Sequence, residues 1–576
     1  MSDYLHSGIS LYLDQLIDWD SYFRLKKGDD VDAQSEREAL GTVLETMAEI
    51  CSNLEPQCRE EWDQAPELVD GKVIRPARIE RAVSEFKQAG LVGLGVEEEY
   101  GGFGMPSFIC NVFLEMMSRA DAGLMTIMGL QTGVAEDIER FGSKELCERY
   151  LPGFTTGEYE GAMDLTEAQA GSDLGGIVTK ATERDGRIFL NGQKIFITNG
   201  NAEIHMVLAR DADTFDETKS TTKGLSLYLC PMKLPDGSDN PMRVERLEHK
   251  LGIHGSPTAV MQYDDAEAFL VGTKGDGLKA MLELMNNARL GVASQGLGIA
   301  EAALTEAINY SRERKQFGFP IGDQPLMKSM LARMAMQVEG SRALLYRGTA
   351  LADRTRAQEM KLARDGESMS ATDKEDLEAR LKRNNIRVRL LTPLVKYLCS
   401  ECCDSVTRKA IQVHGGIGFM AESTVGKLHL DGIITTIYEG TSEIQVSFAL
   451  KEIGKGGLHI VFEEIEEELS TMTDAPRKAL AERVRQGIKS INEASGALLK
   501  DFNYALFSAR HLADTAICVI VSAELLKQAG ASPERMSLAA GWIEWKMPEL
   551  EMHAQRIREG EGTRIEQFEN IIKIAE

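Results

Sequence analysis

A glutamate beside a helix start is the first residue whose surroundings could support acid–base chemistry. Glu439 lies in Thr436-Ile-Tyr-Glu-Gly-Thr-Ser-Glu-Ile-Gln445, where a β-branched stretch stops at Gly440. Thr441 can cap the helix that follows, with Glu443 in its first turn. The helix N-terminus would lower the pKa of Glu439, whereas burial beside an apolar ligand would raise it, so the sequence leaves its protonation open. A lone glutamate before a glycine is also common as a surface or capping residue.

Three further segments combine polar side chains with glycine. They are Met163-Asp-Leu-Thr-Glu-Ala-Gln-Ala-Gly-Ser-Asp173, Tyr310-Ser-Arg-Glu-Arg-Lys-Gln-Phe-Gly318 and Ile411-Gln-Val-His-Gly-Gly-Ile-Gly-Phe419. Hydroxyls and glycines allow close approach of a ligand to the backbone, and guanidinium groups can hold a phosphate. Each segment alone could equally be a capped turn or a solvated helix end.

Four successive regions are expected to position these segments. Residues 1–160 have mostly helical periodicity, 161–276 indicate a compact β domain, 277–453 a helical bundle with a surface insertion at 352–378, and 458–576 a helical extension. Within the β domain, Asn191-Gly192 between two short apolar runs predicts a hairpin turn. The fold class is therefore mainly α with a central β domain.

Composition and charge exclude several classes of protein. The 576 residues include 65 Lys and Arg against 90 Asp and Glu, a net charge of -25 that opposes nucleic-acid binding over most of the surface. The longest apolar run, 516–522, is far shorter than a membrane span. We expect no nucleic-acid partner and no membrane span.

The cysteines and the ends of the sequence favour a cytoplasmic location. Nine cysteines, an odd number, suit a reducing compartment, and neither a secretory signal nor a peroxisomal tail is evident. His254 and His414 have no second ligand at a metal-binding spacing, and Cys399, Cys402 and Cys403 lack a second pair. We therefore expect no metal site.

In this order and spacing, the four segments resemble the acyl-CoA dehydrogenase family of flavoproteins. The shared patterns are Leu-Thr-Glu-x-x-Ala-Gly-Ser-Asp at 165–173, Ile-Thr-Asn-Gly at 197–200, Arg-Lys-x-Phe-Gly at 314–318, Gln-x-x-Gly-Gly-x-Gly-Phe at 412–419 and Tyr-Glu-Gly-Thr at 438–441. The resemblance covers about 80–450. It implies a helical N-terminal domain, a β-barrel middle domain and a helical bundle, together with FAD as cofactor.

The resemblance also implies roles for individual residues. Those expected to contact FAD are Met163, Leu165, Thr166, Ser172, Phe196, Thr198, Arg314, Gln316, Phe317, Gln412, Gly415, Gly416 and Thr441, of which Arg314, Gln316, Phe317, Gln412, Gly415 and Gly416 would reach the FAD of a neighbouring subunit. Ser172, Arg289, Glu439 and Gly440 would contact the acyl-CoA substrate.

The implied reaction is removal of two hydrogens from an acyl-CoA thioester. Glu439 would take the α proton, the β hydride would pass to flavin N5, and the product would be the trans-2-enoyl-CoA. The Glu439 backbone N–H and a ribityl hydroxyl would stabilise the enolate oxygen. Some relatives carry the base just before a recurrent arginine, but here Ala288 precedes Arg289, which leaves Glu439 as base and Arg289 beside it.

Several departures from the family pattern bear on how the flavin fits and on how the chain assembles. Ala168 replaces a usual Pro, Phe196 stands where many relatives have Trp, and Glu443 replaces a neutral residue near the flavin. The extra length resembles a long bacterial subclass that includes 3-methylmercaptopropionyl-CoA dehydrogenases, which suggests 3-methylthiopropionyl-CoA as substrate and a homodimer as assembly. Electron-transferring flavoprotein is the expected acceptor.

Other functions with the same fold stay open. A dehydrogenase for short-, medium- or long-chain fatty acyl-CoA would carry the same motifs, as would an acyl-CoA oxidase. A DNA-associated flavoprotein would need a basic extension, whereas the extension here contains Glu463-Glu-Ile-Glu-Glu-Glu468. A binding protein of this fold would be expected to lose Glu439.

Overall fold

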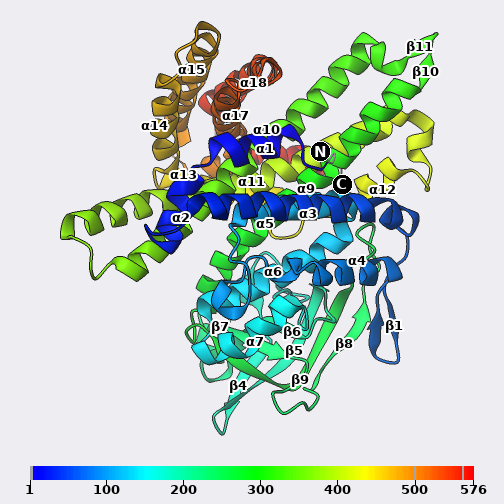
Figure 1. Ribbon diagram of the computed structural model, residues 1–576, viewed down its shortest axis with the longest axis vertical. Coiled ribbons are helices and arrows are strands. Elements are labelled where there is room, and N and C mark those ends of the chain that lie inside the picture. Colours follow the sequence, from blue (N-terminus) through cyan, green and yellow to red (C-terminus); the bar gives the residue numbers. More distant parts are fainter. Residues whose placement is uncertain (1–3, 499–500, 561–563, 576) are drawn as a thin grey trace. The chain divides into compact units, whose positions relative to one another are not determined.

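The structure is a computed structural model that describes residues 4–498, 501–560 and 564–575 (Figure 1). The chain divides into two compact units. The first comprises Met1–Leu5, Thr42–Ala302 and Met420–Ile434, and the second His6–Gly41, Ala303–Phe419 and Thr435–Glu576. Each unit is described by itself.

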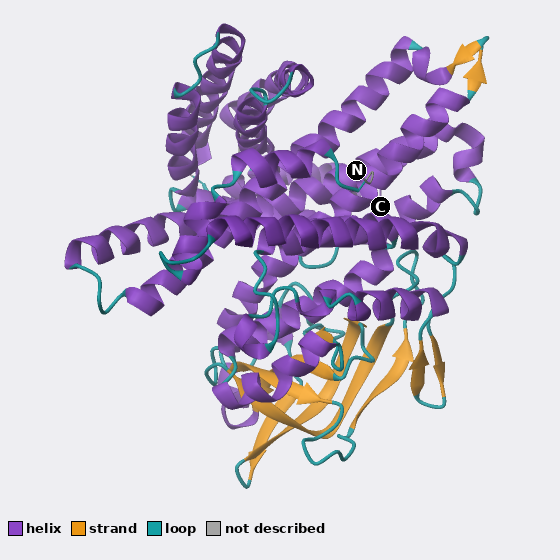
Figure 2. Cartoon of the chain, viewed as in Figure 1, coloured by secondary structure: helices purple, strands orange, loops and turns teal. Residues whose placement is uncertain are grey.

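The first unit contains a closed β barrel, as expected for the middle region. Its strands are β3 (Gly161–Asp164), β4 (Lys180–Arg184), β5 (Arg187–Thr198), β6 (Ile204–Asp211), β7 (Leu225–Pro231), β8 (Met242–Leu247) and β9 (Thr258–Val271). Strands β6, β4, β5, β9 and β7 pair in a ring that closes between β7 and β6. Strand β3 adds in parallel to β6, and β8 adds to β9. Figure 2 shows these strands gathered together in orange.

Alternating side chains of the strands build two apolar cores. On β6, Met206 and Leu208 pack outward against α6 and α7, while Val207 and Ala209 point to the other face. This period of two is the pattern of a strand buried on both sides. Each fully buried large apolar side chain stabilises the unit by roughly 1.5–3 kcal/mol.

Helices of the first unit pack against the barrel, with α6 in contact with β3 and β5. They are α4 (Ala77–Gln88), α5 (Ser107–Ala120), α6 (Ala122–Phe141), α7 (Lys144–Thr156) and α12 (Thr424–Ile433), with parts of α3 (Ala33–Glu60) and α9 (Gly277–Glu313) and the small hairpin of β1 (Glu67–Val69) and β2 (Lys72–Ile74). Their long helical patterns agree with those expected from the sequence.

The prediction of a hairpin turn at Asn191-Gly192 is wrong. Strand β5 runs through these residues, and the turn lies at Asp185-Gly186, between β4 and β5. Asp185 and Gly186 both have positive φ, at 52° and 75°, as a two-residue turn with the twist of the strands requires. Gly192 is needed for a close approach instead, because a Cβ there would lie 2.5 Å from Thr179 Oγ1.

The second unit is almost entirely helical. Its elements are α1 (Ser7–Leu11), a π-helical turn (Tyr12–Leu16), α2 (Trp19–Lys27), the end of α9, β10 (Lys315–Gln316), β11 (Phe319–Pro320), α10 (Pro325–Asp365), α11 (Ala371–His414), α13 (Ser442–Gly454), α14 (Gly457–Ser470), α15 (Ala475–Leu498), α16 (Phe502–Phe507), α17 (Ala509–Gln528), α18 (Pro533–Glu559) and α19 (Arg564–Ala575). Residues 352–378, expected as a surface insertion, form the last turns of α10, a short turn and the start of α11, which together make a helical hairpin.

The extension packs on the long helices through a buried ionic cluster. Helix α17 lies against α10, α11 and α13, and α14, α15 and α18 pack around it. Arg347 of α10 is buried and binds Glu464, Glu468 and Glu524 at 2.9–3.0 Å. Three carboxylates around one guanidinium satisfy the charge that burial would otherwise make costly. In the described part of the chain, no helix has the length and apolar character of a membrane span.

Candidate functional site

The expected base lies in a loop that enters a helix. Glu439 and Gly440 come directly before Thr441, the N-cap residue of α13, whose backbone is extended and whose side chain makes no capping hydrogen bond. Glu439 has φ of +55° and Gly440 has φ of +93°. The predicted cap position is therefore confirmed, and the loop reverses direction through two consecutive left-handed residues.

Two buried polar side chains hold the backbone of this loop. Gln445 Nε2 donates to the carbonyl oxygens of Glu439 at 2.7 Å and Gly440 at 3.3 Å, and Lys396 Nζ donates to the Gly440 oxygen at 2.7 Å. Both Lys396 and Gln445 are fully buried. The loop is thus held through the carbonyl oxygens of Glu439 and Gly440.

Left-handed backbone is concentrated at these motifs. Among the described residues, nine non-glycine residues have positive φ, and four of the nine lie in or beside the predicted site motifs: Phe196, Asn199, Phe317 and Glu439. Such conformations cost about 1–3 kcal/mol each and persist where surrounding structure enforces them. The strain is therefore placed where side chains must point in directions that a regular strand or helix does not allow.

In the first unit, the two segments expected to contact FAD, 163–172 and 196–198 (the flavin-associated segments), lie side by side. Ile195 N donates to Thr166 O at 2.9 Å, which joins the stretch after β3 to strand β5. Met163, Leu165, Thr166 and Thr198 are partly exposed, whereas Ser172 and Phe196 are exposed. The pairing of β5 with β9 shifts register between Lys194 and Ile197, and this bulge turns Phe196 outward, with 60% of its side chain exposed.

A buried ion pair holds these two segments together. Lys194 Nζ lies 2.8 Å from Glu167 Oε1 and donates to Leu165 O at 2.9 Å, and both charged side chains are almost fully buried. The amides of Val178 and Thr179 also donate to Glu167. Burial opposes ionisation of this carboxyl, but Lys194 and the hydrogen bonds lower its pKa below the ordinary value. Sequence reasoning did not find this pair.

A second buried cluster lies behind Met163. Asp164 pairs with His205 Nδ1 at 2.9 Å and accepts from the Tyr263 hydroxyl at 2.5 Å, and His205 Nε2 lies 3.0 Å from Ala202 O. Burial and the neighbouring carboxylate raise the pKa of Tyr263 well above its ordinary range. The cluster joins β3, β6 and β9 at the residue next to Met163.

Arg289 and Ala288 lie on α9 within the first unit. Arg289 is buried, and Ala288 packs against the apolar core of α6, α7 and the barrel. An alanine in this position carries no proton acceptor, which agrees with Glu439 as the expected base.

The arginine- and glycine-containing motifs of the second unit are brought together and left exposed. Tyr310 stacks on His414 with ring centroids 4.2 Å apart, which places the end of α9 beside the end of α11. The motif residues next to these two rings are all exposed: Arg314, Gln316 and Phe317 follow Tyr310, Gln412 precedes His414, and Gly415 and Gly416 follow it. Phe317 is 90% exposed, and a Cβ added to either glycine would meet nothing within 4 Å. A surface this open is suited to contact a molecule outside the chain.

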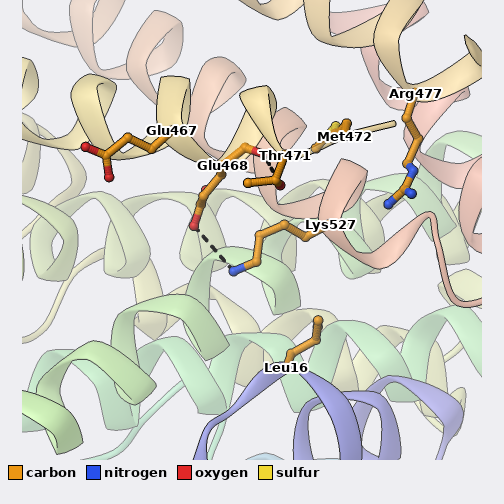
Figure 3. Close-up of a pocket in the computed structure, with 7 residues that line it drawn as sticks. All are labelled: Leu16, Glu467, Glu468, Thr471, Met472, Arg477 and Lys527. Carbon is orange, nitrogen blue, oxygen red and sulfur yellow. Dashed lines mark hydrogen bonds and ion pairs between the residues drawn. The ribbon is translucent and has the colours of Figure 1, made fainter. Parts of the chain in front are cut away.

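A cavity of about 450 Å³ lies elsewhere in the second unit (Figure 3). Its lining consists of Leu16, Glu467, Glu468, Thr471, Met472, Arg477 and Lys527. None of the predicted site residues lines it. Glu468 and Lys527 lie 3.4 Å apart, and both also belong to the ionic cluster around Arg347 and Glu524. Arg477 is engaged by Asp474.

The residues that sequence reasoning missed are the buried supports. Lys396 could have been suspected because it is the single cation within the mostly apolar stretch 390–403. Gln445, Lys194 and Asp164 carry no such local signal. Their importance depends on which backbone atoms lie opposite them in the folded chain.

Comparison with known proteins identifies the family. The N-terminal, middle and C-terminal domains of acyl-CoA dehydrogenase match residues 42–158, 162–266 and 275–454. A 3-methylmercaptopropionyl-CoA dehydrogenase of Ruegeria pomeroyi is 32% identical over 472 residues, covering 78% of this chain and 76% of that protein. The chain belongs to the acyl-CoA dehydrogenase family.

Solved structures agree with this assignment. Butyryl-CoA dehydrogenase of Megasphaera elsdenii is 29% identical, with a TM-score of 0.59, over 71% of this chain and 96% of that one. An acyl-CoA dehydrogenase of Bacillus anthracis, solved in complex with FAD, has a TM-score of 0.72 at 23% identity, over 95% of this chain and 91% of that one. Because the Bacillus anthracis structure covers 95% of this chain, it shows that the helical extension is also found in another protein of this fold. The protein is therefore an oxidoreductase of the acyl-CoA dehydrogenase family, with the expected mainly helical fold around a β barrel.

Proposed function

We propose that this acyl-CoA dehydrogenase family member oxidises an acyl-CoA thioester to its trans-2-enoyl-CoA with FAD as cofactor and Glu439 as base. The observation that carries the proposal is the loop at Glu439. The only carboxyl in a recognised base position projects from a left-handed residue whose carbonyl is fixed by Gln445. A fixed main chain at Glu439 limits the positions that its carboxyl has to search before it meets a substrate proton.

The residues around the two flavin-associated segments fit FAD. Met163 and Leu165 offer apolar contact, Thr166 and Thr198 offer hydroxyl donors, and Phe196 stands out from its strand on a bulge. A flat ring with polar edges needs this combination of apolar surface and a few donors. When bound, the flavin supplies the acceptor for the hydride that leaves the β carbon of the substrate.

The chain's own residues would perform the proton transfer. Glu439 takes the proton from the α carbon, and its backbone N–H stabilises negative charge on the thioester oxygen. Lys396 and Gln445 keep that part of the main chain in place. Arg289 and Ser172 contact the thioester in this proposal, and Gly440 leaves room beside the acyl chain.

The substrate, the acceptor and the assembly are proposed from the relatives and the surface. We take 3-methylthiopropionyl-CoA as the first candidate because a relative named for that substrate covers 78% of this chain. Electron-transferring flavoprotein is the proposed acceptor. Exposure of Arg314, Gln316, Phe317, Gln412, Gly415 and Gly416 supports a homodimer in which these residues reach the partner's FAD.

Anaerobic titration of the flavin-loaded protein tests the proposal. The wild type, Glu439→Gln and the control Glu463→Gln, an exposed carboxylate paired with Arg383, are titrated with 3-methylthiopropionyl-, butyryl-, octanoyl- and palmitoyl-CoA. We expect one ester to bleach the flavin of the wild type and the control, and Glu439→Gln to bind that ester without bleaching.

The other outcomes separate the alternatives. Bleaching by a straight-chain ester alone would indicate a fatty acyl-CoA dehydrogenase, and rapid reoxidation of the reduced protein by oxygen would indicate an oxidase. A flavin that no ester reduces would refute the dehydrogenase proposal and favour a DNA-associated or binding role. Bleaching of the Glu439→Gln flavin at the wild-type rate would refute Glu439 as base.

A further inference from the structure

The segment that carries Glu439 is attached to one face of α11. Three hydrogen bonds make this attachment: Ser400 Oγ to Thr435 O at 2.8 Å, Lys396 Nζ to Gly440 O at 2.7 Å, and Ser442 Oγ to Glu401 Oε1 at 2.6 Å. Ser400 and Lys396 are four residues apart on the helix and therefore lie on the same side. The position of the loop thus depends on where α11 and the first turn of α13 meet.

Helix α17 of the extension reaches that same meeting point through Arg510. Its Nε and Nη2 lie 2.9 and 2.8 Å from Glu443 Oε1, in the first turn of α13, and its Nη1 lies 3.5 Å from Glu401 Oε2, on α11. The guanidinium also lies 5.2 Å from the centre of the Tyr397 ring, whose hydroxyl donates to Asp514 one turn further along α17. One cation therefore contacts both elements that hold the loop.

The charges of this contact help to hold α13 against α11. Glu401 and Glu443 are both carboxylates and are drawn to the same guanidinium. Without that cation they would repel each other across the Ser442 hydrogen bond, and the first turn of α13 would separate more easily from α11. Arginine suits the position because its planar group can serve two carboxylates and an aromatic face at once.

We propose that Arg510 is a positioning residue for the Glu439 loop, supplied by the extension. It lies outside the residues matched by the three family domains, which end at 454. The same ion pair explains why an acidic residue is tolerated at Glu443, where the family pattern has a neutral one, because Arg510 balances its charge. This proposal rests on the proposed function for its catalytic consequence, but not for its structural one.

Four variants test the proposal in the full-length protein. Arg510→Gln removes the cation, Arg510→Lys keeps the charge without the planar group, and Glu443→Gln removes one partner. Arg485→Gln is the control, because Arg485 also pairs with two glutamates of the extension and has similar exposure, 34% against 39%. Amide exchange of peptides covering 438–445 is measured with and without flavin, and kcat and KM are measured with the reducing ester.

We expect Arg510→Gln to speed exchange of 438–445 roughly fivefold, the effect of losing a partly exposed ion-pair network. It should lower kcat about tenfold with less than a twofold change in KM, because substrate contacts remain while the base is displaced. Arg510→Lys should show only part of the faster exchange and of the lower kcat, because it keeps the charge. Glu443→Gln should show smaller changes in the same directions.

Exchange and kcat in Arg510→Gln that match the Arg485→Gln control would overturn the proposal. If Arg510→Gln does not fold, Glu443→Gln and Arg510→Lys decide in its place, and control-like exchange in both overturns it. If no ester reduces the wild-type flavin, the proposed function fails, yet the exchange result without flavin still shows whether Arg510 holds the loop.

Discussion

Breaking the buried pair between Lys194 and Glu167 should loosen the part of the barrel that carries the flavin-associated segments. The side chains are 0% and 3% exposed, and the two charged atoms lie 2.8 Å apart. Removing one partner of such a pair leaves a charge without compensation and costs about 3–5 kcal/mol.

The two single substitutions should differ because the remaining groups differ. In Glu167→Gln, the Lys194 ammonium keeps the Leu165 carbonyl but loses its carboxylate, so we expect the full loss of about 3–5 kcal/mol. In Lys194→Met, the carboxylate keeps the Val178 and Thr179 amides, so the loss should be lower, about 2–3 kcal/mol. The double variant should lose about 1–2 kcal/mol less stability than the sum of the two single losses.

Amide exchange of strands β5 and β6 measures the opening free energy of this region directly. A loss of about 3–5 kcal/mol corresponds to exchange faster by roughly two to three and a half orders of magnitude. Arg187→Gln is the control, because Arg187 is on β5 like Lys194 but is 56% exposed in its pair with Glu267 of β9, and this variant should show no resolvable change. Strictly additive effects in the double variant, or a Glu167→Gln exchange rate equal to that of the control, would refute the reasoning.

Two further predictions follow from the loop and from a buried carboxyl. Gly440→Ala should destabilise the protein by about 1–2 kcal/mol and slow flavin reduction, because the residue has φ of +93° and its Cβ would lie 2.6 Å from Gln445 Nε2. Thermal unfolding and ester titration measure these two effects, and Gly454→Ala is the control because its Cβ would meet nothing within 4 Å. A melting temperature and a rate of flavin reduction equal to those of the wild type would contradict the prediction. Burial raises the pKa of Asp431 to about 7, so the folded protein keeps a proton that the unfolded chain releases near pH 4. The contribution of this protonated carboxyl to stability is therefore complete at low pH and lost as the pH rises through 7. Trp62 donates to Asp431, so its fluorescence emission should titrate near pH 7 in the wild type but not in Asp431→Asn. An emission that does not change with pH in the wild type would contradict the assignment.

Local pattern was enough to predict the main elements. The helical periodicity of 1–160 and 277–453 agrees with the long helices α3, α4, α9, α10 and α11, and the compact β domain expected at 161–276 agrees with the strands of the barrel. The cap at Thr441 was also predictable, because a hydroxyl residue before a polar first turn is a strong local signal. These features depend on neighbours within one or two turns of the chain.

The hairpin shows where local pattern fails. Asp185-Gly186 and Asn191-Gly192 carry the same kind of turn signal six residues apart, and propensity does not choose between them. The choice is made by long-range pairing, since β5 continues past Asn191 alongside β9 and Gly192 allows Thr179 to approach. A strand paired on both sides overrides the weaker preference of a dipeptide for a turn.

The sequence by itself determined the family, the order of helical and β regions and the identity of the expected base. Only the tertiary structure decided what holds that base and the flavin-associated segments in place. Lys194 meets Glu167 from 27 residues away, Lys396 meets Gly440 from 44, and Arg510 meets Glu443 from 67. A buried charge must find a partner wherever the fold brings one, and that partner is set by packing of distant elements rather than by spacing along the chain.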